Sequence, residues 1–494
     1  MLKELGEVIP APANVQPVAA AHFTIDAGTA ISAAPGTERV ATYLAELLRP
    51  ATGFDLPVTP AGGPDALPGI VGLWLDESLG AEEYRLEISG TGVTLTGGTP
   101  AGLFYAVQTL RQLLPADIFA TTPQSVRWTL PGGTIVDRPR FAYRGAMLDV
   151  ARHFFTVAEV KSYLDTLVQF KINHLHLHLT DDQGWRLEIQ SRPALTALSG
   201  GPGTGVDGAG PGFYTAADYA ELVAYAESRF VSVVPEIDMP GHVNAAQVAY
   251  PELTVDGVAP APRTDTKVGY SSLVADKEET YAFVDDVLRE VAALTPGPYL
   301  HIGGDEAQAT SAAEYRTFIE RVLPLVAKYG KSPIGWHEMA AVDLPPGAIT
   351  QYWRTESADA GTARAAANGG KVLMSPADRA YLDMKYTAKT PLGLDWAGVV
   401  DVERAYSWDP ADRLPGVGED ALLGVEAPLW SETLRSLTDV QTMAFPRLPA
   451  IAEVGWSPRQ SRDWDSFRCR LAGYGPRWDI QGVAYHRSAD VPWH

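Results

Sequence analysis

Two adjacent carboxylates lie in the segment Tyr299-Leu-His-Ile-Gly-Gly-Asp-Glu306, directly after a short apolar run and two glycines. A strand sends successive side chains to opposite faces, so Asp305 and Glu306 at a strand end meet different surroundings. Different surroundings separate the pKa values of two carboxyl groups, so that one donates a proton while the other stays ionised. The same residues are also typical of a strand that leads into an acidic helix start, and the segment alone leaves both interpretations open.

The elements that would position this pair alternate along the chain after Pro139. We expect strands at residues 141–150, 172–179, 231–237, 299–302, 334–336, 349–353, 372–374 and 422–425. Expected helices cover residues 157–170, 216–228, 280–294, 312–328, 360–367 and 439–450. Eight strands separated mostly by helices over about 350 residues predict an α/β fold, a (β/α)₈ TIM barrel with insertions.

The preceding residues predict a smaller α+β domain. Strand-like runs at residues 69–75 and 84–89 accompany amphipathic helices at 38–48 and 101–114. No cluster of catalytic residue types occurs there, which favours a non-catalytic role. We therefore divide the chain into a non-catalytic domain, residues 1–138, and a catalytic barrel, residues 139–494. Within the barrel, the glycine-rich residues 200–212 predict a mobile loop.

Barrel enzymes carry their chemistry at the C-terminal ends of the strands, and here those positions hold acids, histidines and tryptophans. In strand order they are Asp149, Arg152 and His153; Asp181, Asp182 and Trp185; Glu236, Asp238 and His242; Asp305 and Glu306; Trp336, His337 and Glu338; Tyr352, Trp353 and Arg354; Tyr381, Asp383 and Trp396; and Glu426, Trp430 and Glu432. Flat aromatic rings stack on the apolar faces of a sugar, while charged groups bind its hydroxyls. Glycosidic cleavage needs a carboxylic acid to protonate the leaving oxygen. No phosphate-binding glycine loop and no serine nucleophile elbow is present, so nucleotide and esterase chemistries lack their parts.

Alternating histidines in the second expected strand, His174, His176 and His178, raise an alternative. Metal-dependent barrel hydrolases use such pairs as ligands. However, these histidines precede the strand end, and no later His–Asp set completes a metal site. We expect them to be buried, hydrogen-bonded core residues.

Composition narrows the partners and the compartment. The 494 residues carry a net charge of −21, which disfavours nucleic acid and anionic membranes as partners. No apolar run is long enough to span a bilayer. Residues 1–10 lack the apolar core of a signal peptide, so we expect a cytoplasmic protein, or a secreted one if a signal was removed. Cys469 is the only cysteine, and we expect a buried structural thiol in a late helix.

Five motifs together carry a resemblance to a known family. They are Leu148-Asp-Val-Ala-Arg-His-Phe-Phe155, His176-Leu-His-Leu-Thr-Asp-Asp-Gln-Gly-Trp185, Val234-Pro-Glu-Ile-Asp-Met-Pro-Gly-His242, His301-Ile-Gly-Gly-Asp-Glu306 and Ala427-Pro-Leu-Trp-Ser-Glu432. In type and order they resemble glycoside hydrolase family 20, the β-N-acetylhexosaminidases, and especially bacterial enzymes of the actinomycete type. The likeness covers residues 140–460, and the preceding α+β unit is similar to that family's non-catalytic domain.

The resemblance implies a mechanism in which the substrate's own 2-acetamido oxygen is the nucleophile and a bicyclic oxazolinium ion forms. Glu306 then matches the general acid/base, and Asp305 matches the carboxylate that orients the acetamide. The remaining matches are Tyr381 as a hydrogen-bond donor to the acetamide; Trp336, Trp353 and Trp430 as the walls around it; Arg152 and Glu432 on the terminal hydroxyls; Asp383 on a further hydroxyl; Trp396 near the leaving group; and Asp181 with His242 supporting the acid/base. Asp238 and Glu236 are placed behind that pair, and His153, Asp182, Asp149 and Glu426 are expected to orient or cap.

The expected function is therefore exo-acting, retaining hydrolysis of terminal N-acetylglucosamine or N-acetylgalactosamine, with no metal and no cofactor. Two alternatives stay open on the same scaffold: a disaccharide-releasing enzyme of the family, similar to a lacto-N-biosidase, and a carbohydrate-binding protein without turnover. The metal-dependent barrel hydrolase is the third.

Overall fold

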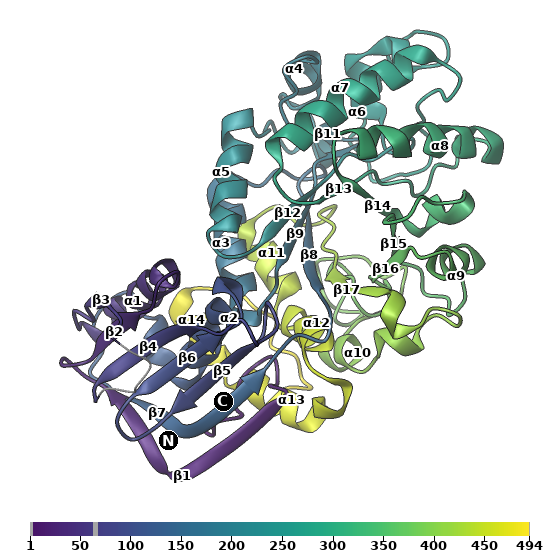
Figure 1. The fold of residues 1–494 in the computed structure, drawn as a ribbon. Coiled ribbons are helices and arrows are strands. Elements are labelled where there is room, and N and C mark those ends of the chain that lie inside the picture. Colours follow the sequence, from purple (N-terminus) through teal and green to yellow (C-terminus); the bar gives the residue numbers. More distant parts are fainter. Residues whose placement is uncertain (1–2, 63–67, 494) are drawn as a thin grey trace. The chain divides into compact units, whose positions relative to one another are not determined.

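A computed structural model describes residues 3–62 and 68–493 of the chain. Contacts within the chain divide it into two compact units. Figure 1 shows the chain coloured by residue number. The first unit comprises residues 1–142, 168–171 and 452–494, and the second comprises residues 143–167 and 172–451.

The first unit is built on a mixed seven-stranded sheet in the order β1-β7-β5-β6-β4-β2-β3. Its strands are β1 Asn14–Ile25, β2 Ala30–Ala33, β3 Val58–Pro60, β4 Ile70–Leu75, β5 Tyr84–Ile88, β6 Val93–Gly97 and β7 Trp128–Asp137. Helices α1 Glu38–Thr52 and α2 Pro100–Leu113 pack against the sheet, and α13 Trp464–Ala472 and α14 Gly475–Gln481 also belong to this unit. The alternation along β5, in which Tyr84, Leu86 and Ile88 are buried, is the period-two pattern of a strand with one face on the core. The smaller α+β domain predicted from the sequence is confirmed.

One carboxylate organises a buried polar cluster in the first unit. Asp137 Oδ2 accepts hydrogen bonds from Lys171 Nζ at 2.9 Å, Tyr84 OH at 2.8 Å and Trp456 Nε1 at 2.9 Å. Its Oδ1 accepts from the backbone N–H groups of Ala13 and Arg138. A buried ion pair is tolerated only when further hydrogen bonds satisfy its remaining atoms, and both oxygens of this carboxylate have donors. Asp137, Lys171, Tyr84 and Trp456 are called the Asp137 cluster below.

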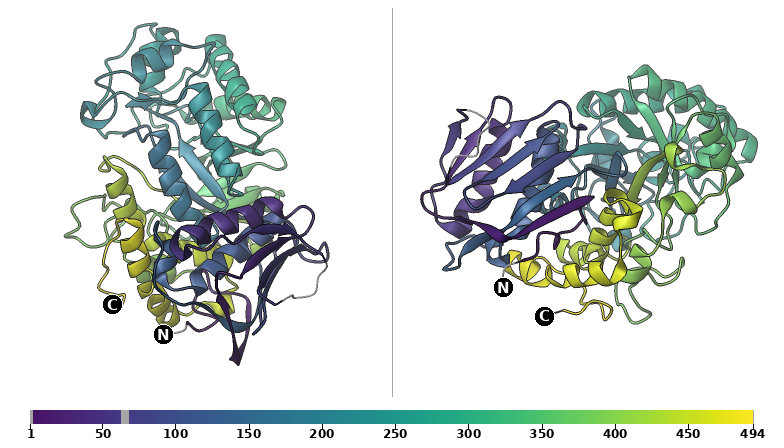
Figure 2. Two further views of the ribbon diagram at one scale, coloured as in Figure 1. Left: turned by 90° about the vertical axis from the view of Figure 1, so that its left-hand side faces the viewer. Right: turned by 60° about the horizontal axis from the view of Figure 1, so that its bottom comes forward.

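The second unit is a closed barrel of eight parallel strands in the order β12-β13-β14-β15-β16-β17-β8-β9. The strands are β8 Tyr143–Asp149, β9 His174–His178, β12 Ser232–Glu236, β13 Tyr299–His301, β14 Ser332–Trp336, β15 Ile349–Tyr352, β16 Lys371–Met374 and β17 Leu422–Ala427. Helices between them include α3 Val157–Leu167, α5 Ala216–Glu227, α7 Glu278–Leu294, α8 Ala312–Lys328, α9 Ala360–Ala367 and α11 Leu437–Ala444, which lie outside the strands (Figure 2). The predicted TIM barrel is confirmed.

Side chains from several strands fill the barrel interior. Tyr143, Val234, Ile334, Ile349 and Leu373, from five different strands, form one buried apolar cluster. Layers of large side chains of this kind make a TIM barrel a packed core rather than a pore, so the chemistry is left to the strand ends.

Two local expectations were wrong. Residues 439–450 do not form one helix, because α11 ends at Ala444 and α12 Arg447–Trp456 begins after Pro446. A proline disfavours the helical region for the residue before it, and Phe445 is extended, with φ −103° and ψ 132°. Cys469 lies in helix α13 as expected but is exposed. Its neighbours two positions away on either side, Phe467 and Leu471, are buried, and two residues correspond to about 200° around a helix.

No helix in the described parts of the chain combines the length and the apolar character needed to cross a bilayer.

Candidate active site

A cavity of about 240 Å³ lies where the barrel strands end. It is lined by Arg152, His242, Thr266, Val268, Asp305, Glu306, Trp353, Tyr381, Asp383, Leu394, Trp396, Trp430 and Glu432. The structure thus brings together all the predicted site residues except Asp181 and Trp336, which lie behind the lining. Thr266, Val268 and Leu394 were not predicted, because they come from long loops and carry no chemically distinctive side chain.

The Asp305–Glu306 pair sits on a tightly turned backbone after β13. Gly303 and Gly304 have φ of +68° and +100°, and Glu306 itself has φ +46°. A Cβ at Gly303 would lie 1.7 Å from Asp238 Oδ1, so only glycine fits there. The adjacent N–H of Gly304 donates to the same oxygen at 3.1 Å. The two glycines therefore press the turn against Asp238 and aim the two acids at the cavity.

The two carboxylates have unequal surroundings, as the sequence predicted. The side chain of Asp305 is 10% exposed, whereas that of Glu306 is 30% exposed at the cavity mouth. Both approach one ring nitrogen: His242 Nε2 lies 3.6 Å from Asp305 Oδ2 and 3.5 Å from Glu306 Oε2. Burial raises the pKa of Asp305 to about 6, even though the charge of His242 lowers it. The carboxyl of Asp305 is thus buried and has a raised pKa, whereas that of Glu306 is accessible to a leaving group.

The charge of His242 is held by acids around it. Burial would lower the pKa of its imidazole, but Asp181, Asp305 and Asp238 raise that pKa well above its ordinary value. His242 Nδ1 pairs with Asp181 Oδ1 at 3.1 Å. The cationic ring of His242 beside Asp305 favours the ionised form of that carboxyl.

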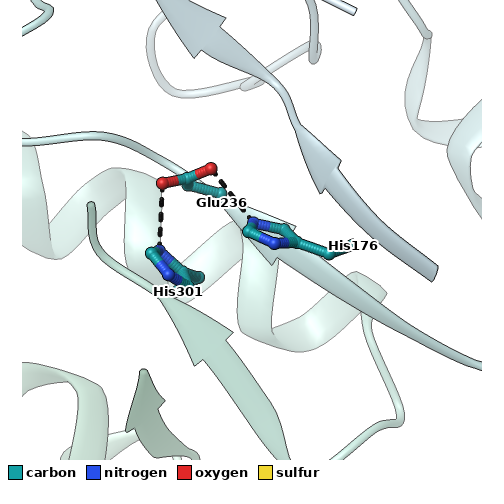
Figure 3. Close-up of side chains that lie close together, drawn as sticks. All are labelled: His176, Glu236 and His301. Atoms are coloured by element: carbon teal, nitrogen blue, oxygen red, sulfur yellow. Dashed lines mark ion pairs between the residues drawn. The ribbon is translucent and has the colours of Figure 1, made fainter. Parts of the chain in front are cut away.

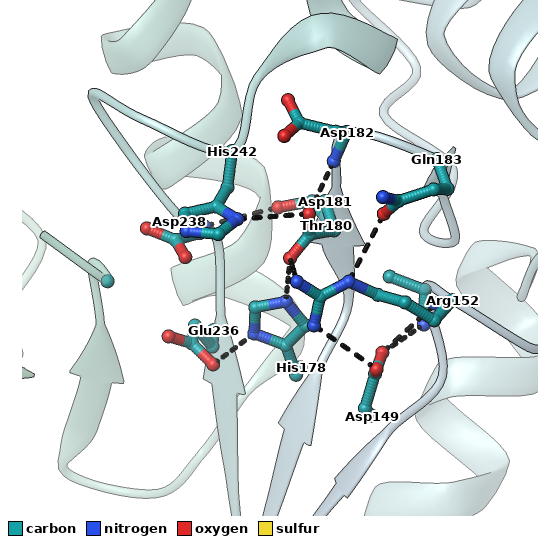
Figure 4. Close-up of polar contacts among 12 residues, drawn as sticks. Asp149, Arg152, His178, Thr180, Asp181, Asp182, Gln183, Glu236, Asp238 and His242 are labelled. Carbon is teal, nitrogen blue, oxygen red and sulfur yellow. Dashed lines mark hydrogen bonds and ion pairs between the residues drawn. The ribbon is translucent and has the colours of Figure 1, made fainter. Parts of the chain in front are cut away.

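Asp181 connects this histidine to the arginine of the cavity (Figure 4). Its Oδ2 is 2.9 Å from Arg152 Nη2 and 2.7 Å from His178 Nε2. Burial opposes its ionisation, yet the charges of Arg152 and His242 lower the pKa of Asp181 well below its usual range. Arg152 is fixed further by Asp149 at 3.3 Å and by Gln183 Oε1 at 3.1 Å. The backbone carbonyl of Arg152 accepts a hydrogen bond of 2.9 Å from the N–H of Val206, which lies in the glycine-rich residues 200–212.

Glu236 is the centre of a second buried network (Figure 3). Its Oε1 accepts the indole N–H of Trp336 at 2.9 Å and lies 3.0 Å from His301 Nδ1. Its Oε2 lies 3.0 Å from His176 Nε2 and also pairs with His178. Burial opposes its charge, but the three histidines lower the pKa of Glu236 well below the ordinary value. One carboxylate thereby positions both Trp336 and the histidine that contacts Asp181.

Of the alternating histidines of β9, His176 and His178 are buried and paired with carboxylates, as expected, whereas the expectation that His174 is buried was wrong. Burial lowers the pKa of His176, but Glu426 and Glu236 raise it to about 9. His174 is only partly buried and stacks on the ring of Tyr143 at 3.8 Å. Some of these side chains could reach a common ion, as in the set His176, Glu236 and His301, but their nitrogen and oxygen atoms pair with one another.

Aromatic rings form a continuous set around the cavity. Trp353 and Tyr381 are stacked at 6.5 Å with an angle of 22°, and Trp430 lies 6.3 Å from Tyr381 and 5.8 Å from Trp336. Trp396 stands at the rim, 52% exposed and 5.7 Å from Trp353. The indole N–H of Trp353 donates to Glu338 Oε2 at 3.1 Å. These rings offer apolar faces to a ligand whose edges are polar.

Several polar atoms at the cavity have no hydrogen-bond partner among the described residues. They are His242 Nε2, Asp305 Oδ1, both carboxylate oxygens of Asp383, and Glu432 Oε2. Burial, followed by the charge of Glu432, raises the pKa of Asp383 well above its ordinary value. Buried polar atoms in folded proteins are nearly always paired, so this concentration indicates a ligand rich in hydroxyl and amide groups.

Two other acids at the strand ends form hydrogen bonds with the loops and do not line the cavity. Asp149 accepts the N–H groups of Ala151, Arg152 and Ser431. Asp182 accepts the N–H of Asn244 and the hydroxyl of Ser271. These contacts orient and cap the loops that carry the site.

Comparison with known proteins matches the barrel and the preceding domain to the same family. Residues 141–459 match the family described as glycosyl hydrolase family 20, catalytic domain, and residues 6–138 match domain 2 of that family. A beta-N-acetylhexosaminidase from Cellulomonas fimi is 43% identical over 490 residues, which cover 98% of this chain and 97% of that protein.

Solved structures agree with this. The GH20 beta-N-acetylhexosaminidase from Streptomyces coelicolor A3(2) has a TM-score of 0.96 at 54% identity, covering 100% of this chain and 99% of that one. A mutant Streptomyces plicatus beta-hexosaminidase in complex with the product GlcNAc has a TM-score of 0.95 at 53% identity, covering 100% and 98%.

Proposed function

This chain belongs to glycoside hydrolase family 20, and we propose that it is an exo-acting, retaining β-N-acetylhexosaminidase whose substrate supplies its own nucleophile. The observation that carries the proposal is the unequal carboxylate pair, Asp305 buried and Glu306 at the mouth, inside a cavity walled by tryptophans. The substrate is a small molecule or oligosaccharide that ends in a β-linked N-acetylhexosamine.

Binding begins with the hydroxyls of the terminal sugar. Arg152 offers guanidinium N–H donors, while Glu432 and Asp383 present the oxygens that lack partners within the chain. These groups surround a cavity of about 240 Å³, which suits one monosaccharide. The size favours release of single sugars over release of disaccharides.

The first chemical step is intramolecular. Trp353 and Trp430 confine the N-acetyl group, with Trp336 packed behind Trp430, and the hydroxyl of Tyr381 donates to the acetamide oxygen. That oxygen attacks the anomeric carbon as the glycosidic bond breaks, and Glu306 gives its proton to the leaving oxygen. Ionised Asp305 accepts the acetamide N–H and stabilises the positive charge of the oxazolinium ion. Holding the reacting atoms in place converts the attack into a favourable unimolecular step.

The second step returns the enzyme to its starting state. Glu306, now a carboxylate, takes a proton from a water molecule that attacks the anomeric carbon. The oxazolinium ring opens, the acetamide is restored, and the sugar leaves with its original configuration. His242, held by Asp181, stays beside both carboxylates through both steps.

A pair of matched chromogenic substrates tests this proposal. An aryl N-acetyl-β-glucosaminide should be hydrolysed rapidly, while the aryl β-glucoside without the acetamide should react at least about a hundred-fold more slowly, because it has no nucleophile. Equal rates would refute substrate-assisted catalysis. No turnover of either would indicate a binding protein, and loss of turnover on chelation would indicate a metal-dependent hydrolase.

A thiazoline that mimics the bicyclic ion supplies an independent readout. Because an enzyme is complementary to its high-energy species, this compound should inhibit competitively and bind more tightly than the sugar product. Its failure to bind would contradict the mechanism.

A further inference from the structure

A second cavity, of about 780 Å³, adjoins the catalytic one. It lies among the segments that follow β13, β14 and β15 and the first turns of α8 and α9. Glu306 and Trp353 line both cavities. Any group bonded to the oxygen that Glu306 protonates therefore stands at the entrance of this larger space.

Three arginines line this second cavity, although the chain carries a net charge of −21. Arg316 is exposed on α8, and it has no hydrogen-bond or ion-pair partner among the described residues. Arg354 reaches Glu338 only at 4.0 Å. Arg364 lies 3.9 Å from Asp343, and its Nη2 donates to the carbonyl of Ala340 at 2.6 Å. Exposed pairs at such distances contribute little, so most of this positive charge stays available to a ligand. We name this space the arginine cavity.

Three acids, Glu306, Glu338 and Asp359, and one histidine, His337, also line the arginine cavity, and they offset only part of that charge. Burial raises the pKa of Glu338 to about 8, so it is mostly protonated at neutral pH. Asp359 accepts the N–H of Thr362 at 2.6 Å as the cap of α9. Burial lowers the pKa of His337 to about 4, so its ring is neutral. The catalytic cavity has the opposite composition, with one arginine, Arg152, among four acidic side chains.

We propose that the arginine cavity receives the leaving saccharide and selects for anionic ones, in which a carboxylate or a sulfate lies on the sugar attached to the terminal N-acetylhexosamine. This inference rests on the function proposed above. Trp396, at the rim of the catalytic cavity, offers a stacking face that is indifferent to charge. In the arginine cavity, Arg316 and Arg354 supply donors that match carboxylate and sulfate oxygens. The enzyme would thus act best on oligosaccharides that alternate an N-acetylhexosamine with an acidic sugar.

The test compares three disaccharides that share a terminal β-N-acetylglucosamine and differ in the second sugar: neutral hexose, uronate, or sulfated hexose. The measured quantity is the ratio of kcat/KM for each anionic substrate to that for the neutral one, because this ratio cancels any general change in activity. Each arginine should contribute about two- to five-fold to the ratio, as expected for a partly exposed ion pair. The preference should shrink as salt is raised, because screening weakens exposed pairs.

Arg316→Gln with Arg354→Gln should bring the ratio close to one. Arg321→Gln is the matched control, since Arg321 lies on α8 with Arg316, is partly exposed, and pairs with Glu278 outside the cavity. A wild-type ratio near one overturns the proposal. A ratio above one that persists in the double variant also overturns it, because the arginines would not be the cause. Preference for only one of the two anions identifies that anion as the recognised group.

Direct titration of a free uronic acid and a free sulfated monosaccharide separates this inference from the proposed function. Weak binding that the double variant loses and Arg321→Gln keeps supports the anionic site even if no N-acetylhexosaminide is hydrolysed. Absence of binding together with normal turnover of the neutral substrate leaves the proposed function standing and removes the anionic site.

Discussion

Each unit of this chain buries a set of charges, and the two sets differ in how completely they are satisfied. In the Asp137 cluster, both carboxylate oxygens accept hydrogen bonds from side chains or backbone. At the barrel, Asp305, Asp383 and Glu432 keep oxygens that are buried and have no partner among the described residues. Similar residue types are therefore used for two different purposes.

The difference shows how a site is distinguished from a structural ion pair. A satisfied cluster contributes to folding, and removing one member leaves the others buried and unpaired. An unsatisfied cluster opposes folding until a ligand supplies the missing groups. The unpaired atoms of the barrel lie beside a cavity, whereas the Asp137 cluster lines neither cavity.

The largest effect is expected at the mouth of the catalytic cavity. Glu306→Gln removes the proton that the leaving oxygen needs, so kcat for substrates with poor leaving groups should fall by about 10²–10⁴-fold. Activated aryl substrates should lose less, because their leaving groups need less protonation. Measuring kcat against leaving-group pKa checks this. A uniform loss across the series would contradict the role of Glu306.

Asp137→Asn should affect stability and not catalysis. Breaking a buried ion pair by removing one partner costs about 3–5 kcal/mol, so the free energy of unfolding should drop by about that amount. Urea unfolding followed by circular dichroism measures it. The control Glu278→Gln disrupts an exposed pair with Arg321 and should stay within about 1 kcal/mol. A fall in kcat of the folded Asp137→Asn protein would show that the two networks are not separate in function.

Glu236→Gln should have an intermediate effect on catalysis. The neutral amide no longer balances the charges of His176 and His178, and it can accept fewer of the donors that Glu236 holds, Trp336 among them. We expect kcat to fall on the order of ten-fold, less than the effect of losing the proton donor itself. The pH profile of kcat should also move, which loss of packing alone would not cause. Unchanged kcat and pH profile would remove Glu236 from the positioning of the site.

Asp383→Asn should stabilise the free protein and weaken substrate binding. The change removes a buried carboxyl that lacks donors and lies near Glu432, so the free energy of unfolding should rise by about 1 kcal/mol. The KM for an aryl N-acetylglucosaminide should rise at the same time. Thermal unfolding and initial rates measure the two effects. Lower stability in this variant would mean that the carboxylate is already satisfied in the free protein.

The smallest effect concerns pH. Because burial raises the pKa of Asp305 to about 6 and the mechanism needs its ionised form, kcat/KM should fall as pH drops through about 6. The profile of kcat/KM reports groups of the free enzyme, so this limb belongs to the unliganded site. In Asp305→Asn the limb should be absent and the rate of the first step low. A limb that persists in that variant would belong to another group.

Hydrophobic periodicity and strand-end position predicted most of the barrel and the site. Helices α8 and α9 have the predicted bounds, Ala312–Lys328 and Ala360–Ala367, and each begins directly after a capping side chain, Ser311 or Asp359. The catalytic residue types were found since parallel strands of a barrel bring their C-terminal ends together.

What escaped prediction depends on register and on loops. Glu236 meets both His178 and His301 because these residues are direct partners across neighbouring strands. That register is set by the stagger of the closed barrel, which no single strand encodes. In the first unit, the long strands β1 and β7 contain Pro17, Pro131 and paired glycines, which weaken a strand pattern in the sequence.

The exposed Cys469 has a practical consequence, because it is the one thiol in the chain. A maleimide dye or a surface linker attached there gives a homogeneous product without prior mutagenesis. Cys469 lies in helix α13 of the first unit and is not among the residues that line either cavity. An immobilised or fluorescent form of the protein can therefore be prepared from the natural sequence.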